Sequence, residues 1–252
     1  MADIQSALRL DGVRETIREP LRILAERLAA QLGDNLKSIS VVGSGLTDDF
    51  QPGTSDINTV VLLEADDSPA LNAVASLVKP MSRYRLSPPL LMTSHYIARS
   101  RDVFPVEFLD FQLIHETILG EDPFASLQIE KRYVRLQCER ELKATLVRLR
   151  QGYVASVGNK RMVHDLLIST AKGLTPLLRA VLWLKDIQRP NTMDSVLRKA
   201  ASGFDVDLNA VIVAERWRYE KPRLTDAEVE STFVAVLRAV DRLTAIVDEF
   251  EL

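Results

Sequence analysis

A glycine-serine pair and an aspartate are the residues whose types and order point to chemistry. Gly43 and Ser44 end the largely apolar segment 37–42, and Asp56 precedes a second apolar run, 60–63, after a polar loop. A glycine turn lets backbone N–H groups approach a phosphate closely, because glycine has no Cβ. A carboxylate at the start of the next strand can hold a Mg²⁺ ion that bridges such phosphates. The pattern therefore predicts a site for metal-bound phosphate groups.

The stretch from Lys37 to Glu64, KSISVVGSGLTDDFQPGTSDINTVVLLE, resembles the signature of the nucleotidyltransferase superfamily, which has the DNA polymerase β-like fold. That signature is an apolar strand, Gly-Ser, a loop and Asp-x-Asp on the next strand, with a third carboxylate on a later strand. The resemblance implies that Gly43 and Ser44 hold the phosphates of a nucleoside triphosphate. It also implies that Asp56 is the primary ligand of Mg²⁺ or Mn²⁺.

Position 58 departs from the signature, because it is asparagine where the family has its second aspartate. Residues 56 and 58 are two apart on an extended strand, so they share one face. The amide oxygen of Asn58 can coordinate a metal ion but brings no charge, whereas a two-metal site normally offsets two divalent cations with carboxylates. We expect a second metal to bind weakly or not at all. Either one metal then supports catalysis, or the site has lost turnover.

The third carboxylate has two candidates, Glu107 and Asp110, both in the segment 104–114, which we predict to be a strand. Strand alternation would place them on opposite faces, so only one would face the site. The resemblance to aminoglycoside nucleotidyltransferases favours Glu107 as general base on the acceptor hydroxyl, with Asp110 as the alternative. Alternatively, either residue could have only a structural role, in a salt bridge at the edge of the sheet. Basic candidates for a triphosphate clamp are Arg99, Arg101, Lys131, Arg132 and Arg135.

Strand and helix patterns alternate up to about residue 125, and only helical patterns follow. Helices are expected at 13–32 and 68–81, and strands at 37–42, 57–64, 90–96 and 104–114. The later helices are expected at 127–154, 161–187, 194–201, 207–217 and 225–250, the last with a capping box of Thr225 and Glu228.

The fold class predicted from this order is α+β. A small mixed sheet, the nucleotidyltransferase-like domain, spans 1–125, and an all-helical bundle domain spans 126–252. The arrangement also resembles aminoglycoside nucleotidyltransferases, in which the helical part helps to bind the acceptor.

The composition is that of a globular protein, with 46% hydrophobic and 27% charged residues and a net charge of −3. This balance gives no global attraction to nucleic acid. One cysteine and three histidines leave carboxylates as the metal ligands, which suits Mg²⁺ or Mn²⁺. The N-terminus lacks the apolar core of a signal peptide and no apolar run approaches membrane-spanning length, so a cytoplasmic protein without a membrane partner is expected.

Two functions fit these observations. As an enzyme, the protein would transfer a nucleotidyl group from a nucleoside triphosphate to a hydroxyl of a small-molecule or protein acceptor, with Mg²⁺ and with release of pyrophosphate. As a catalytically weak or inactive member of the same fold, it would bind a nucleotide and act as a regulator. Asn58 favours the second interpretation. The oligomeric state is left open, with a homodimer as one option.

Overall fold

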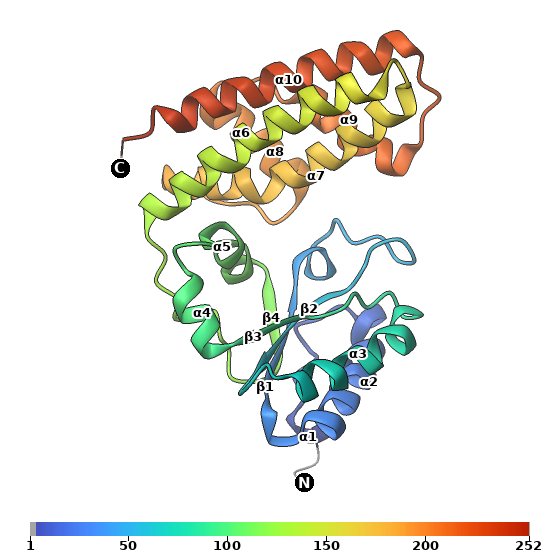
Figure 1. Cartoon of the computed structure of the whole chain (residues 1–252), viewed down its shortest axis with the longest axis vertical. Coiled ribbons are helices and arrows are strands. Elements are labelled where there is room, and N and C mark those ends of the chain that lie inside the picture. Colours follow the sequence, from blue (N-terminus) through green and yellow to red (C-terminus); the bar gives the residue numbers. More distant parts are fainter. Residues whose placement is uncertain (1–3, 252) are drawn as a thin grey trace. The chain divides into compact units, whose positions relative to one another are not determined.

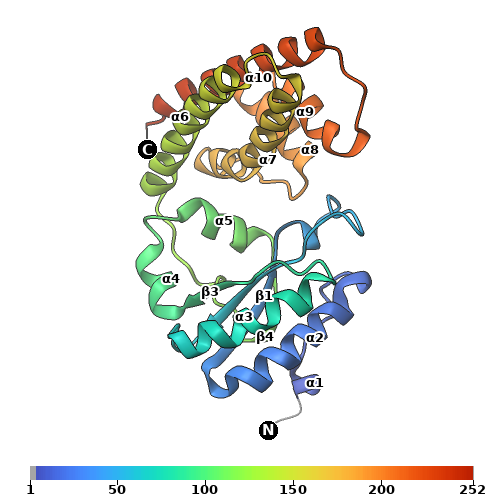
Figure 2. The same cartoon turned by 45° about the vertical axis from the view of Figure 1, so that its right-hand side comes forward.

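The computed structural model describes the backbone of residues 4–251 and divides the chain into two compact units. The first unit runs to Arg101 and resumes over Phe108–Gln128, and the second comprises Asp102–Glu107 and the chain from Ile129 onward. A sheet with its helices forms the first unit, and the second is helical (Figures 1 and 2). The predicted α+β fold class is confirmed.

A mixed sheet of four strands organises the first unit. Strand β2 (Asn58–Leu63) lies between β1 (Leu36–Val42) and β3 (Leu90–Thr93), and β4 (His115–Gly120) borders β1 on its other side. Strand β1 is antiparallel to β2 and to β4, whereas β2 and β3 are parallel. With these directions, the end of β1 and the beginnings of the other strands meet at one edge of the sheet.

Helices α2 (Glu15–Leu32) and α3 (Ser68–Ser82) pack side by side against one face of the sheet (Figure 1). The apolar residues of α2 recur three or four positions apart and form one buried stripe, which includes Leu21. This stripe belongs to the same core as Val61 of β2. Because side chains alternate along a strand, Asn58 faces the opposite side of the sheet.

Five helices lie wholly within the described part of the second unit: α6 (Lys131–Ser156), α7 (Lys160–Leu184), α8 (Met193–Phe204), α9 (Asn209–Glu220) and α10 (Asp226–Asp248). Helix α7 packs against each of the others. The predicted capping box is confirmed, because Thr225 accepts a hydrogen bond from Glu228 N while the Glu228 side chain accepts one from Thr225 N.

Helix α7 is long and apolar enough to cross a membrane, which differs from the expectation that no segment approaches that length. Of its most apolar window, 61% is buried. This burial, with contacts to α6, α8, α9 and α10, is typical of a core helix.

The segment 104–114 is mainly a helix, so the prediction of a strand there is wrong. Helix α5 (Pro105–Leu113) begins with a proline, whose fixed φ suits the first helical position. Glu107 adds a favourable charge to its first turn. Apolar residues occupy most of this segment, so its periodicity does not separate strand from helix. The strand follows α5 instead, as β4.

Strand β3 is shorter than the predicted 90–96, because a helix starts within that range. The Thr93 side chain accepts a hydrogen bond from Tyr96 N (3.1 Å) and caps α4 (Ser94–Ser100). A short helix, α1 (Ile4–Ala7), precedes α2.

Helix α6 ends on a strained residue, which yields a stability prediction. Val157 has φ 47° and ψ 42°, in the left-handed region where a β-branched side chain is disfavoured. Val157 is 89% exposed, so removal of its side chain loses few packing contacts. Val157→Gly is expected to stabilise the helical unit by ~1 kcal/mol. Thermal denaturation followed by circular dichroism should show a rise in Tm of about 2–4 °C.

Val154→Gly is the matched control for this prediction. Val154 is 75% exposed and lies within α6, where glycine weakens the helix instead of relieving strain. This variant is expected to have a lower Tm than the native protein. A similar decrease in both variants would show that the left-handed backbone at Val157 carries no strain.

Candidate functional site

The Gly43–Ser44 turn lies directly beside the start of β2. Val42 pairs with Asn58, and a Cβ added to Gly43 would stand 4.0 Å from Asn58 Nδ2. Gly43 has φ of +73°, a conformation that glycine adopts without steric cost, and its N–H donates to Ile114 O (3.3 Å). The half-buried Ser44 hydroxyl has no hydrogen-bond partner within residues 4–251. It is therefore available to a ligand at this edge.

Asp56 is paired with a cation of the protein itself. Its Oδ1 lies 2.8 Å from Nη2 of Arg85, and the Arg85 and Asp56 side chains are 45% and 58% exposed. The same Nη2 donates to the carbonyl oxygen of Thr54, in the loop that leads into β2. An exposed ion pair of this kind contributes at most about 1 kcal/mol to stability. Its main consequence is electrostatic, because Arg85 offsets the charge of Asp56.

The backbone between α3 and β3 fixes Arg85 in this place. Arg85 N donates to Ser82 O at the end of α3 (2.9 Å), and Arg85 O accepts from Ile57 N (2.8 Å). Arg85 has φ of 63°, a left-handed conformation that non-glycine residues rarely adopt. The second of these hydrogen bonds ties Arg85 to the residue that follows Asp56, so the two side chains meet.

The strand next to β2 supplies no carboxylate beside Asn58. Ile57 forms a bridge with Leu86, and Val60 pairs with Leu90, so the residues across from Asn58 are 87–89. Their sequence is Ser-Pro-Pro, and β3 itself is Leu-Leu-Met-Thr. A third carboxylate on this strand, as the signature requires on a later strand, is therefore missing here.

The described residues do not fit the two-metal centre that the nucleotidyltransferase fold implies. Asn58 brings no charge, and the charge of Asp56 is offset by Arg85. Within residues 4–251, no group of three or more His, Cys, Asp or Glu is placed to hold a metal ion. Two divalent cations require several carboxylates around them. The edge of the sheet has too little negative charge for that arrangement.

The two candidates for the third carboxylate lie three positions apart on α5. Because residues i and i+3 share a helical face, the prediction that Glu107 and Asp110 face opposite ways is wrong. Glu107 belongs to the second unit, where its carboxylate accepts a hydrogen bond from Gln137 Nε2 (2.8 Å). The oxygen of the same amide accepts from Val106 N (2.9 Å), so the buried Gln137 holds this turn of α5.

Asp110 belongs to the first unit and is linked to the Gly43 turn. Its carbonyl oxygen accepts from Ile114 N (2.9 Å), and the Ile114 carbonyl accepts from Gly43 N. Asp110 and the Gly43 turn belong to the same unit and are connected by backbone hydrogen bonds, whereas Glu107 belongs to the other unit.

A histidine-aspartate pair stands at the same edge, where β4 begins. His115 pairs with Val42 across the sheet, and its Nε2 lies 2.9 Å from Asp122 Oδ2. Burial would raise the pKa of Asp122, but hydrogen bonds with His115 and with the backbone N–H of Phe124 outweigh it. The pKa therefore lies below its ordinary value. This pair helps to anchor the segment after β4.

Stability in acid is expected to depend on Asp122. The pKa of Asp122 is lower in the folded than in the unfolded protein. The contribution of its carboxylate to folding stability is therefore present above the unfolded pKa and is lost as pH falls through the folded pKa. Asp122→Asn is expected to lower the Tm near neutral pH and to reduce the further loss between about pH 5 and pH 3. Asp66→Asn, at an exposed position, is the control. An acid-induced loss of Tm in Asp122→Asn equal to that of the native protein would contradict the assignment.

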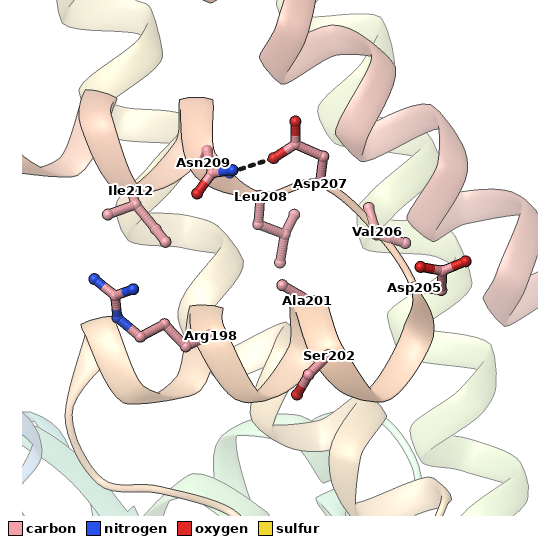
Figure 3. A pocket seen from close by; sticks show the side chains of 9 residues that line it. All are labelled: Arg198, Ala201, Ser202, Asp205, Val206, Asp207, Leu208, Asn209 and Ile212. Atoms are coloured by element: carbon pink, nitrogen blue, oxygen red, sulfur yellow. Dashed lines mark hydrogen bonds between the residues drawn. The ribbon is translucent and has the colours of Figure 1, made fainter.

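Neither of two surface pockets contains the residues predicted to bind phosphate or metal or to act as the base, which are Gly43, Ser44, Asp56, Asn58, Glu107 and Asp110. One, of about 490 Å³, lies between α8 and α9, with Arg198 in its lining (Figure 3). There Asp207 already accepts a hydrogen bond from Asn209 N (2.9 Å). The other, of about 390 Å³, includes Leu62, at the far end of β2 from Asn58. This second pocket is also lined by Arg101, a candidate for the triphosphate clamp.

Sequence reasoning overlooked Arg85 and sought the phosphate-binding cation elsewhere. Several of its candidates have partners in the second unit: Lys131 with Asp186 (2.8 Å), Arg132 with Glu130 (3.0 Å) and Arg135 with Phe250 O (2.9 Å). Arg85 lies in an ordinary Arg-Tyr-Arg stretch after a helix. Only the bridge between Leu86, the residue after Arg85, and Ile57 brings Arg85 to Asp56, and the sequence carries no local signal for that pairing.

With this sheet order and a helical second unit, the chain has the fold of a solved nucleotidyltransferase structure. A solved structure with this fold is spectinomycin adenyltransferase AAD(9) from Enterococcus faecialis with ATP and spectinomycin. The match covers 88% of this chain and 98% of that chain, at 12% sequence identity and a TM-score of 0.57. No protein-family model and no curated protein sequence matches the chain.

Proposed function

We propose that this protein binds a nucleoside triphosphate at the sheet edge where β1 ends and β2 begins, and that it transfers the nucleotidyl group slowly or not at all. The observation that supports this proposal is the ion pair between Asp56 and Arg85. With Asn58 beside it, Asp56 cannot offset two catalytic cations. The turn at Gly43 and the free Ser44 hydroxyl remain suited to phosphate. The protein would then act in the cytoplasm as a nucleotide-dependent regulator.

Metal-dependent transfer to a small-molecule or protein hydroxyl is the second candidate. The fold similarity to an adenyltransferase whose structure contains ATP and spectinomycin supports ATP and a small-molecule acceptor. In this case Asp56 and Asn58 would bind Mg²⁺ or Mn²⁺, and Asp110 or Glu107 would be the general base. The backbone link between Asp110 and the Gly43 turn favours Asp110 over Glu107 in that role.

Gly43→Ala is expected to weaken ATP binding at least about tenfold, because alanine disfavours φ of +73° and its Cβ narrows the approach to the backbone N–H groups. The measurement is isothermal titration calorimetry with ATP, in Mg²⁺ and in chelator. Gly33→Ala is the matched control, since Gly33 also has a positive φ (53°) and open space around it, but lies before β1.

The two variants separate a nucleotide site from a merely structural turn. If the proposal is correct, only Gly43→Ala loses affinity for ATP. Native protein that does not bind ATP in either condition, or equal binding by native protein and Gly43→Ala, would refute nucleotide binding at this edge.

A further inference from the structure

We propose that Arg85 takes the place of the divalent cation at this edge, so that the protein binds the polyphosphate chain of a nucleotide without metal. This inference rests on the proposed nucleotide-binding function and adds the identity of the cation. It starts from the disagreement between the carboxylate-rich site that the fold implies and the Arg85–Asp56 pair that this chain has.

Arg85 has donors left for a ligand. Its Nη2 serves both Thr54 O and Asp56 Oδ1. Its Nε and Nη1 have no hydrogen-bond partner within residues 4–251. A guanidinium keeps its charge at every physiological pH and presents its N–H groups in a fixed plane, which matches two oxygens of a phosphate. The Arg85 side chain as a whole is 45% exposed, so a ligand can reach it from solvent.

The strand order sets the length of anion that fits. Gly43 ends β1 and Arg85 precedes β3, on either side of the start of β2. Two strand spacings separate them, about 10 Å. A single phosphate cannot contact the turn and the guanidinium together across this gap. A chain of two or three phosphates can, so nucleoside di- and triphosphates should bind more tightly than monophosphates.

The backbone at Arg85 is consistent with a role for its side chain. A φ of 63° disfavours any residue that has a Cβ, whereas glycine adopts it freely. An arginine here therefore costs stability that its exposed ion pair hardly offsets. Strained positions of this kind are concentrated at functional sites.

Asp56 then has a positioning role. It orients the guanidinium through Nη2 and competes with the incoming phosphate for the same charge. Removal of its charge should strengthen nucleotide binding in chelator. If Asp56 instead holds a metal ion that binds the phosphates, its removal should weaken binding in Mg²⁺. The two assignments therefore give opposite signs for Asp56→Asn.

The test is calorimetric titration of the full chain with ATP and with AMP, in EDTA and in Mg²⁺. Native protein is expected to bind ATP in EDTA within about threefold of its affinity in Mg²⁺, and at least about tenfold more tightly than AMP. Arg85→Gln should lose at least about tenfold in ATP affinity in EDTA. Arg83→Gln is the matched control and should bind as the native protein does, because Arg83 stacks on Tyr84 and donates to its hydroxyl.

Arg85→Gly controls for the possibility that Arg85→Gln loses binding because it fails to fold. The glycine variant removes the guanidinium and relieves the left-handed strain, so it should lose ATP binding in EDTA while its Tm is no lower than that of Arg85→Gln. Binding only in Mg²⁺, unaffected by Arg85→Gln and lost in Asp56→Asn, would overturn the role of Arg85 and leave nucleotide binding intact. An absence of ATP binding by the native protein in both conditions would instead refute the proposed function itself.

Discussion

Asn58→Asp combined with Arg85→Gln is expected to release pyrophosphate from ATP at least about tenfold faster than the native protein in Mg²⁺, because a gain of ~1.4 kcal/mol in the transition state has that effect. The first substitution adds a carboxylate on the face that Asp56 shares. The second removes the guanidinium that lies 2.8 Å from Asp56. Together they make the edge more negative by two charges, at distances where Coulomb energies reach several kcal/mol.

Each single variant is expected to gain less than the double variant. Asn58→Asp leaves Arg85 in competition with the metal, and Arg85→Gln leaves an uncharged amide at position 58. The effects of residues that act on the same cation are not additive. The rate gain of the double variant should therefore exceed the sum of the gains of the single variants. Rapid turnover by the native protein that falls in the double variant would show that Asn58 and Arg85 are working residues of an active enzyme. Equal background rates would show that the charges at positions 58 and 85 do not limit turnover.

The local patterns predict most of the fold because the forces that form these elements are local. The stripe of Leu21 and its neighbours predicts α2, and the capping box predicts the start of α10. The Gly-Ser pair between two apolar runs places the turn next to β2, and the pairing of Val42 with Asn58 agrees with that placement. In each case, the residues that determine the structure lie close together in the sequence.

The errors occur where distant pairing or mixed periodicity decides the structure. The segment around Glu107 and Asp110 is apolar on most sides, and a helix forms there in place of the predicted strand. Arg85 reaches Asp56 through strand pairing over a long separation in the sequence, which no local pattern reveals. The electrostatics of the site depend on this pairing, so the sequence alone overstates its resemblance to a metal site.

Gly120→Ala is expected to destabilise the first unit by ~3 kcal/mol or more, since it combines overpacking with a strained backbone. An added Cβ would lie 1.9 Å from Lys37 O and 2.9 Å from Ser38 Cα, and Gly120 has φ of +75°. Neither clash can be relieved by a side chain, because the atoms belong to the backbone of β1. The pairing of β1 with β4 must therefore shift near Ser38.

Urea denaturation of the native protein, Gly120→Ala and Gly33→Ala measures this effect. Gly33 has φ of +53° with nothing within 4 Å of an added Cβ, so its variant loses only the backbone term and no packing. A loss in Gly120→Ala no greater than in Gly33→Ala would contradict the close approach of β4 to β1.

We propose that the site binds a nucleotide and has lost the charge needed for rapid transfer. The most direct test measures ATP binding and pyrophosphate release on the same native protein, with Mg²⁺ and a panel of hydroxyl acceptors. We expect saturable ATP binding that Gly43→Ala weakens, with release of pyrophosphate far below ~1 s⁻¹, the lower end of the range for ordinary enzymes. Turnover at or above that rate, abolished by Asp56→Asn, would contradict the proposal and establish a working metal-dependent transferase.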